Sequence, residues 1–292
     1  MHIVFHLGLH CTDGGLLIRS ILQNRARLLQ SGVAVPGPLR YRELLGETST
    51  RLRGAPAPPA TEALILEALS ATIDTQRVIL SNENFLCRSD VALGTDCLYP
   101  KAHKSSWLRQ CLPTHEVEFA IALRNPASFL PDLINGAGGP PPPTELLHNG
   151  IWLDDLSWSD VVMRIVSANP GARIVVWCHE DTPFIWSEIQ HEVAGQDNTR
   201  PLEGELDMAE TIMTPEGYKR LNEFLETRDV RTAAKRRRAV AAFLETHAIR
   251  DEIEAEIDLP DWTNETVETL TELYEDDIEA IARLPEVSFI SP

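Results

Sequence analysis

Apolar residues gather in short runs through the first two thirds of the chain, and polar or glycine-rich stretches separate them. The run over residues 173–178 is nearly continuous, which is typical of a strand buried in a parallel sheet. The run at the N-terminus alternates imperfectly between apolar and polar positions. The pattern predicts strands over residues 2–9, 77–81, 116–123 and 173–178.

Helical spacing of apolar residues separates these strands and dominates the last third of the chain. The predicted helices cover residues 16–31, 62–75, 105–111, 156–168, 182–194, 214–228, 230–257 and 263–284. Proline-rich stretches predict loops over 53–61 and 136–144. The second should be a surface loop, because consecutive prolines remove main-chain donors that a helix or sheet needs.

The alternation of strands and helices predicts an α/β fold with a parallel sheet flanked by helices. A helical C-terminal part follows over about 214–292. No internal repeat or composition change marks a boundary, so we expect one domain over 1–292.

The net charge of the chain limits the classes of binding partner that we expect. The net charge is −18, and the last 48 residues alone, with fifteen acidic and two basic residues, carry −13 of it. This balance argues against general binding to nucleic acid or to an anionic membrane. No apolar run approaches the roughly 20 residues that span a bilayer. Five widely spaced cysteines without a C-x-x-C pattern suggest neither a disulfide framework nor a zinc site, so we expect no metal and a cytoplasmic location.

The first strand leads into a glycine-containing loop, His-Leu-Gly-Leu-His-Cys-Thr-Asp-Gly-Gly, over residues 6–15. Main-chain N–H groups and the positive end of a helix dipole favour a phosphate or sulfate at such a junction. The loop lacks the G-x-x-x-x-G-K-[ST] pattern, and no lysine precedes Lys101. The sequence therefore argues against a kinase or nucleoside triphosphatase.

The loop resembles the phosphosulfate-binding loop of bacterial sulfotransferase-like proteins, whose usual form is H-x-G-x-H-K-T-G-T-T. The matching positions are His6, Gly8, His10 and Thr12. Further similar segments follow in order along nearly the whole chain. They include Asn24-Arg25, Gly32-Val33, Leu80-Ser81-Asn82-Glu83, Ala122-Leu123-Arg124-Asn125-Pro126 and Trp177-Cys178-His179-Glu180-Asp181-Thr182-Pro183.

This resemblance implies a P-loop sulfotransferase-like fold that binds 3′-phosphoadenosine 5′-phosphosulfate. It implies transfer of the sulfuryl group to a hydroxyl or amine of a glycan or small metabolite. Glu83 or His10 would act as the general base, and Arg124 together with position 132 would hold the 3′-phosphate. The loop positions that would hold the sulfuryl group are Cys11, Thr12, Asp13, Gly14 and Gly15.

The chain departs from the family pattern at those working positions. Cys11 replaces the loop lysine, Asp13 replaces a glycine, and Asp132 replaces a serine. Gly14 and Gly15 replace two hydroxyl residues. Added carboxylates repel a polyanionic nucleotide, so we expect weak donor binding. Two functions stay open: a sulfotransferase, or a catalytically inactive protein of the same fold with a binding or assembly role.

Three of the candidate site residues also have two possible roles each. Arg124 either holds a phosphate or forms an ion pair with Asp132, and the ion pair is favoured. His10 is either a general base or a structural histidine, and Glu83 is either a base or a capping or ion-paired carboxylate. The ends of parallel strands meet at one edge of a sheet, so Gly14, Glu83 and Arg124 should converge there.

Overall fold

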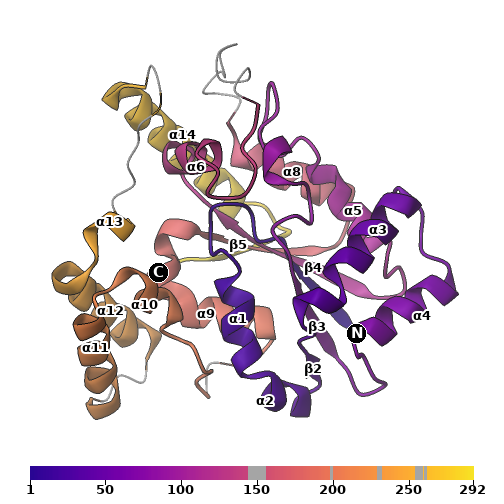
Figure 1. The fold of residues 1–292 in the computed structure, drawn as a ribbon, viewed down its shortest axis with the longest axis horizontal. Helices are drawn as coiled ribbons and strands as arrows, with labels where there is room; N and C mark the ends of the chain where they lie inside the picture. The colour runs from indigo at the N-terminus through magenta and orange to yellow at the C-terminus, as the bar shows by residue number, and fades with distance from the viewer. Residues whose placement is uncertain (144–155, 198–199, 229–231, 254–258, 260–261) are drawn as a thin grey trace.

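A six-stranded parallel sheet forms the centre of the molecule (Figure 1). The computed structural model describes residues 1–143, 156–197, 200–228, 232–253, 259 and 262–292. The strands are β1 (His2–His6), β2 (Val33–Ala34), β3 (Arg77–Ser81), β4 (Glu116–Leu123), β5 (Arg173–Cys178) and β6 (Val287–Ile290). Their order is β2-β3-β1-β4-β5-β6, and all five pairings between neighbours are parallel. The α/β class and the parallel sheet predicted from the sequence are confirmed.

Helices cover both faces of this sheet, because successive side chains of a strand point to opposite sides. In β1, Val4 packs on one face, while Ile3 and Phe5 pack on the other. The first face carries α1 (Leu16–Gln23), α2 (Arg25–Gln30) and α9 (Thr182–Ala194). The second carries α3 (Arg42–Leu52), α4 (Pro59–Ala68), α5 (Ser105–Arg109), α6 (Pro126–Ile134), α8 (Trp158–Ala168) and α14 (Asn264–Ala282).

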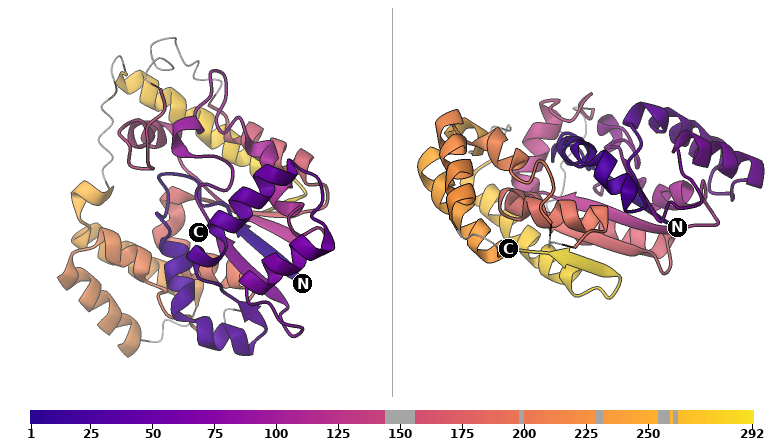
Figure 2. Two further views of the ribbon diagram at one scale, coloured as in Figure 1. Left: turned by 45° about the vertical axis from the view of Figure 1, so that its right-hand side comes forward. Right: turned by 90° about the horizontal axis from the view of Figure 1, so that it is seen from below.

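A smaller group of helices lies at one end of the molecule (Figure 2). It contains α10 (Asp207–Ile212), α11 (Pro215–Thr227), α12 (Ala233–His247) and α13 (Arg250–Ile253). These helices have an apolar cluster of their own, with Met213, Leu221 and Val240 buried in it. Arg237 Nε of α12 lies 3.1 Å from Glu188 of α9, which ties this group to the main body.

Several predicted boundaries are correct and others are wrong. The strands 77–81, 116–123 and 173–178 and the helix 182–194 have the predicted bounds, whereas β1 ends at His6 instead of residue 9. Residues 136–143 form the predicted loop, and Thr144 lies outside the described residues.

The helix predicted over 16–31 is two helices, because Asn24 turns the chain. Its side chain donates to the carbonyls of Ser20 and Glu203 and accepts the Glu203 N–H, which fixes the break.

Other predicted helices also differ. The helix predicted over 62–75 is α4, which begins at Pro59 inside the stretch predicted as a loop and ends at Ala68. Ser70 then adopts a left-handed φ of 56°, which a helix cannot continue through. The helix predicted over 230–257 is interrupted at residues 248–249, where Ala248 pairs with Met213 as an isolated bridge. Residues 230–231 and 254–257 lie outside the described part of the chain.

Candidate functional site

The strand order creates a crevice at the carboxyl edge of the sheet. From β1 the chain passes to α1 on one face, whereas from β4 it passes to α6 on the other face. Two neighbouring strands whose connections leave to opposite faces mark the point where α/β folds bind ligands. The β1 loop (residues 7–15) and Arg124, the residue after β4, both lie at this point.

The β1 loop turns sharply before α1. Cys11, Gly14 and Gly15 have φ values of 58°, 55° and 75°. These left-handed conformations suit glycine, and they explain the Gly-Gly pair at the start of the helix. The thiol of Cys11 packs against the loop after α6, since a Cβ on Gly138 would lie 2.9 Å from its sulfur. Burial and the nearby Asp132 raise the pKa of the Cys11 thiol to about 12, so the thiol stays protonated and weakly nucleophilic at neutral pH.

The oxygens of Asp13 accept hydrogen bonds from the N-terminus of α1. Its carboxylate accepts the Leu17 N–H at 2.8 Å, and its carbonyl accepts the Leu16 N–H at 2.9 Å. The Thr12 hydroxyl also bonds within the loop, donating to the Leu9 carbonyl at 2.5 Å. Two N–H groups of the first turn of α1, and the Thr12 hydroxyl, are therefore engaged by the protein and not free for an anion.

Arg124 is held by three groups of the chain. One guanidinium nitrogen lies 2.6 Å from the Asp132 carboxylate and donates to the Cys11 carbonyl, also at 2.6 Å. Nε donates to the Ser128 hydroxyl at 3.1 Å. The Arg124 side chain is only 13% exposed, so little of its charge faces solvent. The ion pair favoured from the sequence is present.

His10 is buried and bonded through both ring nitrogens. Nδ1 lies 2.9 Å from the Tyr99 hydroxyl, and Nε2 lies 3.4 Å from the side-chain oxygen of Asn84. The side-chain oxygen of Asn84 can only accept, so Nε2 carries the ring proton, and the Tyr99 hydroxyl donates to Nδ1 while it accepts the His10 main-chain N–H. Burial lowers the pKa of His10. This arrangement supports the structural interpretation of His10.

Glu83 lines a cavity of about 170 Å³ beside the β1 loop. Asp13, Gly14, Gly15, Arg19 and Arg42 share this cavity. Burial raises the pKa of the Glu83 carboxyl, the Arg42 charge opposes that shift, and Asp13 adds to it. Glu83 lines a cavity with a carboxyl of increased proton affinity, whereas both ring nitrogens of His10 are engaged, so Glu83 is better placed than His10 to act as a base.

The three residues expected to converge do so. Gly14 and Glu83 line the same cavity, and Arg124 bonds to Cys11 of the same loop. All three follow strands that pair in parallel around β1.

Sequence reasoning missed the functional potential of two histidines at this edge. His6 Nδ1 lies 3.0 Å from the Ser81 hydroxyl, while its buried Nε2 has no hydrogen-bond partner among the described residues. His179, after β5, likewise has a buried Nδ1 without a partner there. Burial lowers the pKa of both rings, and the Arg124 charge lowers that of His179 further. Their positions at strand ends were the available signal, but the strand order that brings them together is not local.

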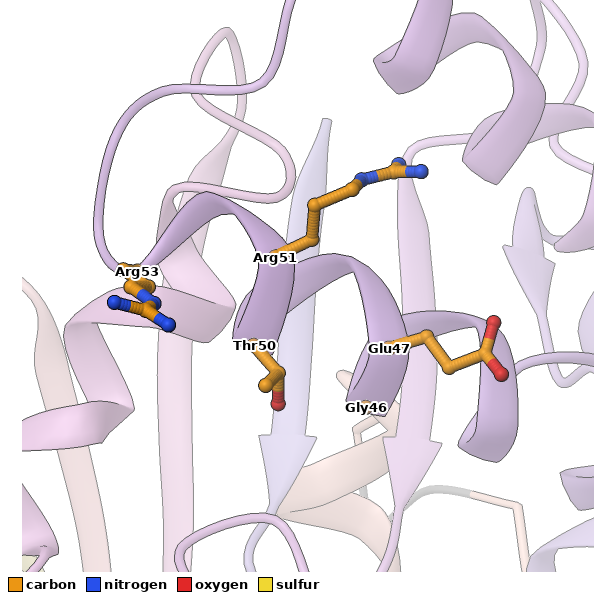
Figure 3. Close-up of a pocket in the computed structure, with 5 residues that line it drawn as sticks. All are labelled: Gly46, Glu47, Thr50, Arg51 and Arg53. Carbon is orange, nitrogen blue, oxygen red and sulfur yellow. The ribbon is translucent and has the colours of Figure 1, made fainter.

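A hollow larger than the Glu83 cavity is a different feature. It measures about 780 Å³ and is lined by Gly46, Glu47, Thr50, Arg51 and Arg53, all exposed. Figure 3 shows the side chains of Glu47, Thr50, Arg51 and Arg53 extending in different directions, so they do not converge on a ligand. Within the described residues no three His, Cys, Asp or Glu side chains are grouped so as to hold a metal ion. None of the described helices combines the length and apolarity that crossing a bilayer requires.

Comparisons with family models, with curated proteins and with solved structures found no match to this chain. The resemblance to bacterial sulfotransferase-like proteins therefore rests on the ordered sequence motifs.

Proposed function

We propose that the chain is a sulfotransferase-like protein that has lost the ability to bind the phosphosulfate donor and that acts as a binding protein. The Arg124–Asp132 ion pair carries this proposal. The resemblance gives Arg124 the task of holding a nucleotide 3′-phosphate. Here its guanidinium is already neutralised by a carboxylate at 2.6 Å, and freeing it would leave that carboxylate near the incoming phosphate.

The rest of the edge does not fit the donor either. Asp13 places a carboxylate at the start of α1, where the family pattern leaves room for an anion. The adjoining cavity has two acidic and two basic side chains, so its charges cancel. Its volume of about 170 Å³ lies below the roughly 300 Å³ at which pockets for small molecules begin.

Calorimetric titration with adenosine 3′,5′-bisphosphate tests this proposal without knowledge of an acceptor. We expect no binding by the natural chain in the micromolar range. The matched variant carries Cys11→Lys, Asp13→Gly and Asp132→Ser, and it should gain about a hundredfold or more in affinity, equivalent to about 3 kcal/mol. The gain should shrink at high salt because it is electrostatic. Micromolar binding by the natural chain would overturn the proposal.

Sulfuryl transfer is the second candidate, and the position of Glu83 favours it. A carboxyl whose pKa is raised by burial, in a cavity beside the β1 loop, can accept a proton from a hydroxyl or amine of a glycan or small metabolite. Micromolar nucleotide binding together with activity lost in Glu83→Gln would establish this candidate in place of the first.

We infer the same cellular compartment and the same class of binding partner for both candidate functions. A cytoplasmic protein is supported by five free cysteines, and a partner other than nucleic acid is supported by the net charge of −18. Binding of duplex DNA at physiological salt would contradict the second inference.

A further inference from the structure

A second cavity lies next to the candidate site, on the other side of the segment that follows β3. It has a volume of about 360 Å³, within the range of small-molecule pockets. Its walls come from α3, from residues 82–91 after β3, and from the turn that leads into α5. Asn84 lines it and also holds His10 of the β1 loop, so the cavity adjoins the carboxyl edge.

Positive charge is concentrated in this cavity. Arg88, Lys101 and Lys104 line it, and Asp90 is the only acidic residue among the lining residues that the structure describes. The lining therefore has a net charge of +2 in a chain whose net charge is −18. Two of the four lysines of the whole sequence are Lys101 and Lys104.

These cations are poorly neutralised by the protein. Asp90 forms its ion pair with Arg88, whereas neither lysine has an ion pair within the described residues. Lys104 Nζ lies 4.4 Å from the centre of the Trp107 ring, which holds the ammonium group in place without cancelling its charge. Burial raises the pKa of the Cys87 thiol to about 12, so this lining residue adds no negative charge.

The remaining polar lining consists largely of donors and hydroxyls. Asn82 and Asn84 use their side-chain oxygens on the Asn84 main-chain N–H and on the His10 ring, respectively. Their amide N–H groups have no hydrogen-bond partner in the described part of the chain. Thr50 of α3 adds a hydroxyl group, and the Ser49 hydroxyl, which donates to the Gly46 carbonyl at 3.0 Å, keeps its capacity to accept. Such a lining suits a ligand with many oxygen acceptors and one anionic group.

We propose that this cavity binds a monosaccharide-sized, polyhydroxylated anion through Lys101 and Lys104. The anionic group is a carboxylate or a phosphate, since an ammonium group pairs with either. The two lysines provide the attraction, and the amides after β3 orient the hydroxyl groups. This proposal rests on residues of the second cavity and not on nucleotide binding at the β1 loop.

Titration calorimetry with three probes tests it: D-glucuronate for the carboxylate, glucose 6-phosphate for the phosphate, and glucose as the neutral control. At least one anion should bind the natural chain with a Kd below about 1 mM, and glucose about tenfold or more weakly. The stronger of the two anions identifies the anionic group. Failure of both anions to bind, or equal binding of glucose, would overturn the proposal.

Variants then locate the site. Lys101→Gln and Lys104→Gln should each weaken the anion about tenfold, because each removes a charge-assisted contact. Lys219→Gln removes the same charge from an exposed lysine of α11 and should leave binding unchanged. Asp90→Asn should tighten binding by removing the opposing carboxylate.

Unchanged affinity in both cavity variants would place any binding elsewhere and overturn the proposal. Thermal unfolding of each variant confirms that the fold is intact. Titration of the same samples with adenosine 3′,5′-bisphosphate separates this result from the proposed function, since that nucleotide tests the β1 loop.

Discussion

The polar side chains at the carboxyl edge bond mainly to the protein itself. Asp13 bonds the first turn of α1, Thr12 bonds its own loop, and Arg124 bonds Asp132. Each contact satisfies a group that would otherwise be partly buried without a partner, which costs about 1–3 kcal/mol. The same contacts reduce what the edge can offer to an anion. At the scale of single residues, local stability and donor binding therefore compete for the same atoms.

The effect of burial on Glu83 can be tested through the pH dependence of stability. Burial raises its pKa above the ordinary value of 4.5, so the folded state binds more protons than the unfolded state between the two pKa values. The contribution of this group to stability is present at low pH and is lost as the pH rises through the carboxyl range. Glu83→Gln stays neutral throughout. We expect its stability relative to the natural chain to increase as the pH rises above the ordinary carboxyl pKa of 4.5 and through the raised pKa of Glu83.

Urea unfolding of both proteins at several pH values measures this difference. Glu47→Gln, which removes an exposed carboxylate of α3, is the control and should show a smaller change. A stability difference for Glu83→Gln that stays constant or falls with rising pH would show that the Glu83 carboxyl is not destabilised by burial.

Some residue contacts follow from sequence and others do not. Arg124 and Asp132 are eight residues apart, on either side of the first turns of α6, so a short segment brings their charges together. Arg42 reaches the carbonyl of Ser81 from a different part of the chain. His6 and His179 meet the same edge only after β1, β4 and β5 are paired. Contacts of this kind depend on strand order, which local patterns do not contain.

Some helices and strands likewise follow from the local sequence, whereas others do not. The strands β4 and β5 were predicted with correct bounds because both faces are buried and nearly every position is apolar. The strand β6 was not predicted, because its four residues are only half-buried and pairing with β5 defines it. The helix α6 was missed because Pro131 lies inside it, and a proline lacks the N–H that a helix uses.

Docking of α14 on α8 can be tested with neighbouring aspartates. The Asp277 carboxylate of α14 accepts the Trp158 N–H at 2.5 Å and the Ser159 N–H at 3.3 Å, two donors left free at the start of α8. Asp277→Ala should lower the free energy of unfolding by about 1–2 kcal/mol, as loss of a helix cap does. The adjacent Asp276 is exposed, so Asp276→Ala should change it by less than about 0.5 kcal/mol.

Chemical denaturation of the two variants at one pH makes the comparison. Equal losses in both would mean that the effect comes from the acidic surface of α14 and not from the contact with α8.

At the scale of the whole molecule, apolar burial is uneven. The two large clusters share the sheet and include most of the buried apolar side chains, whereas the cluster of the C-terminal helices has five buried residues among those that the structure describes. Arg236 donates to the Ser187 hydroxyl and Arg237 pairs with Glu188, both of α9, and these arginine side chains are 29% and 27% exposed. Ion pairs that are partly exposed contribute little to stability. The C-terminal helices should therefore open more easily than the sheet.

Hydrogen exchange under native conditions measures this difference directly. Amides of α11 and α12 should exchange about tenfold or more faster than those of β4, because local opening of a small cluster costs less than global unfolding. Leu221→Ala should accelerate exchange in α11 and α12 further, since a fully buried leucine contributes about 2–5 kcal/mol, and should leave β4 unchanged. Leu39→Ala, at a side chain that is 99% exposed, is the control and should alter neither region. Equal protection of α11, α12 and β4, with all three responding together to Leu221→Ala, would instead show a single cooperative unit in which the C-terminal helices are as stable as the sheet.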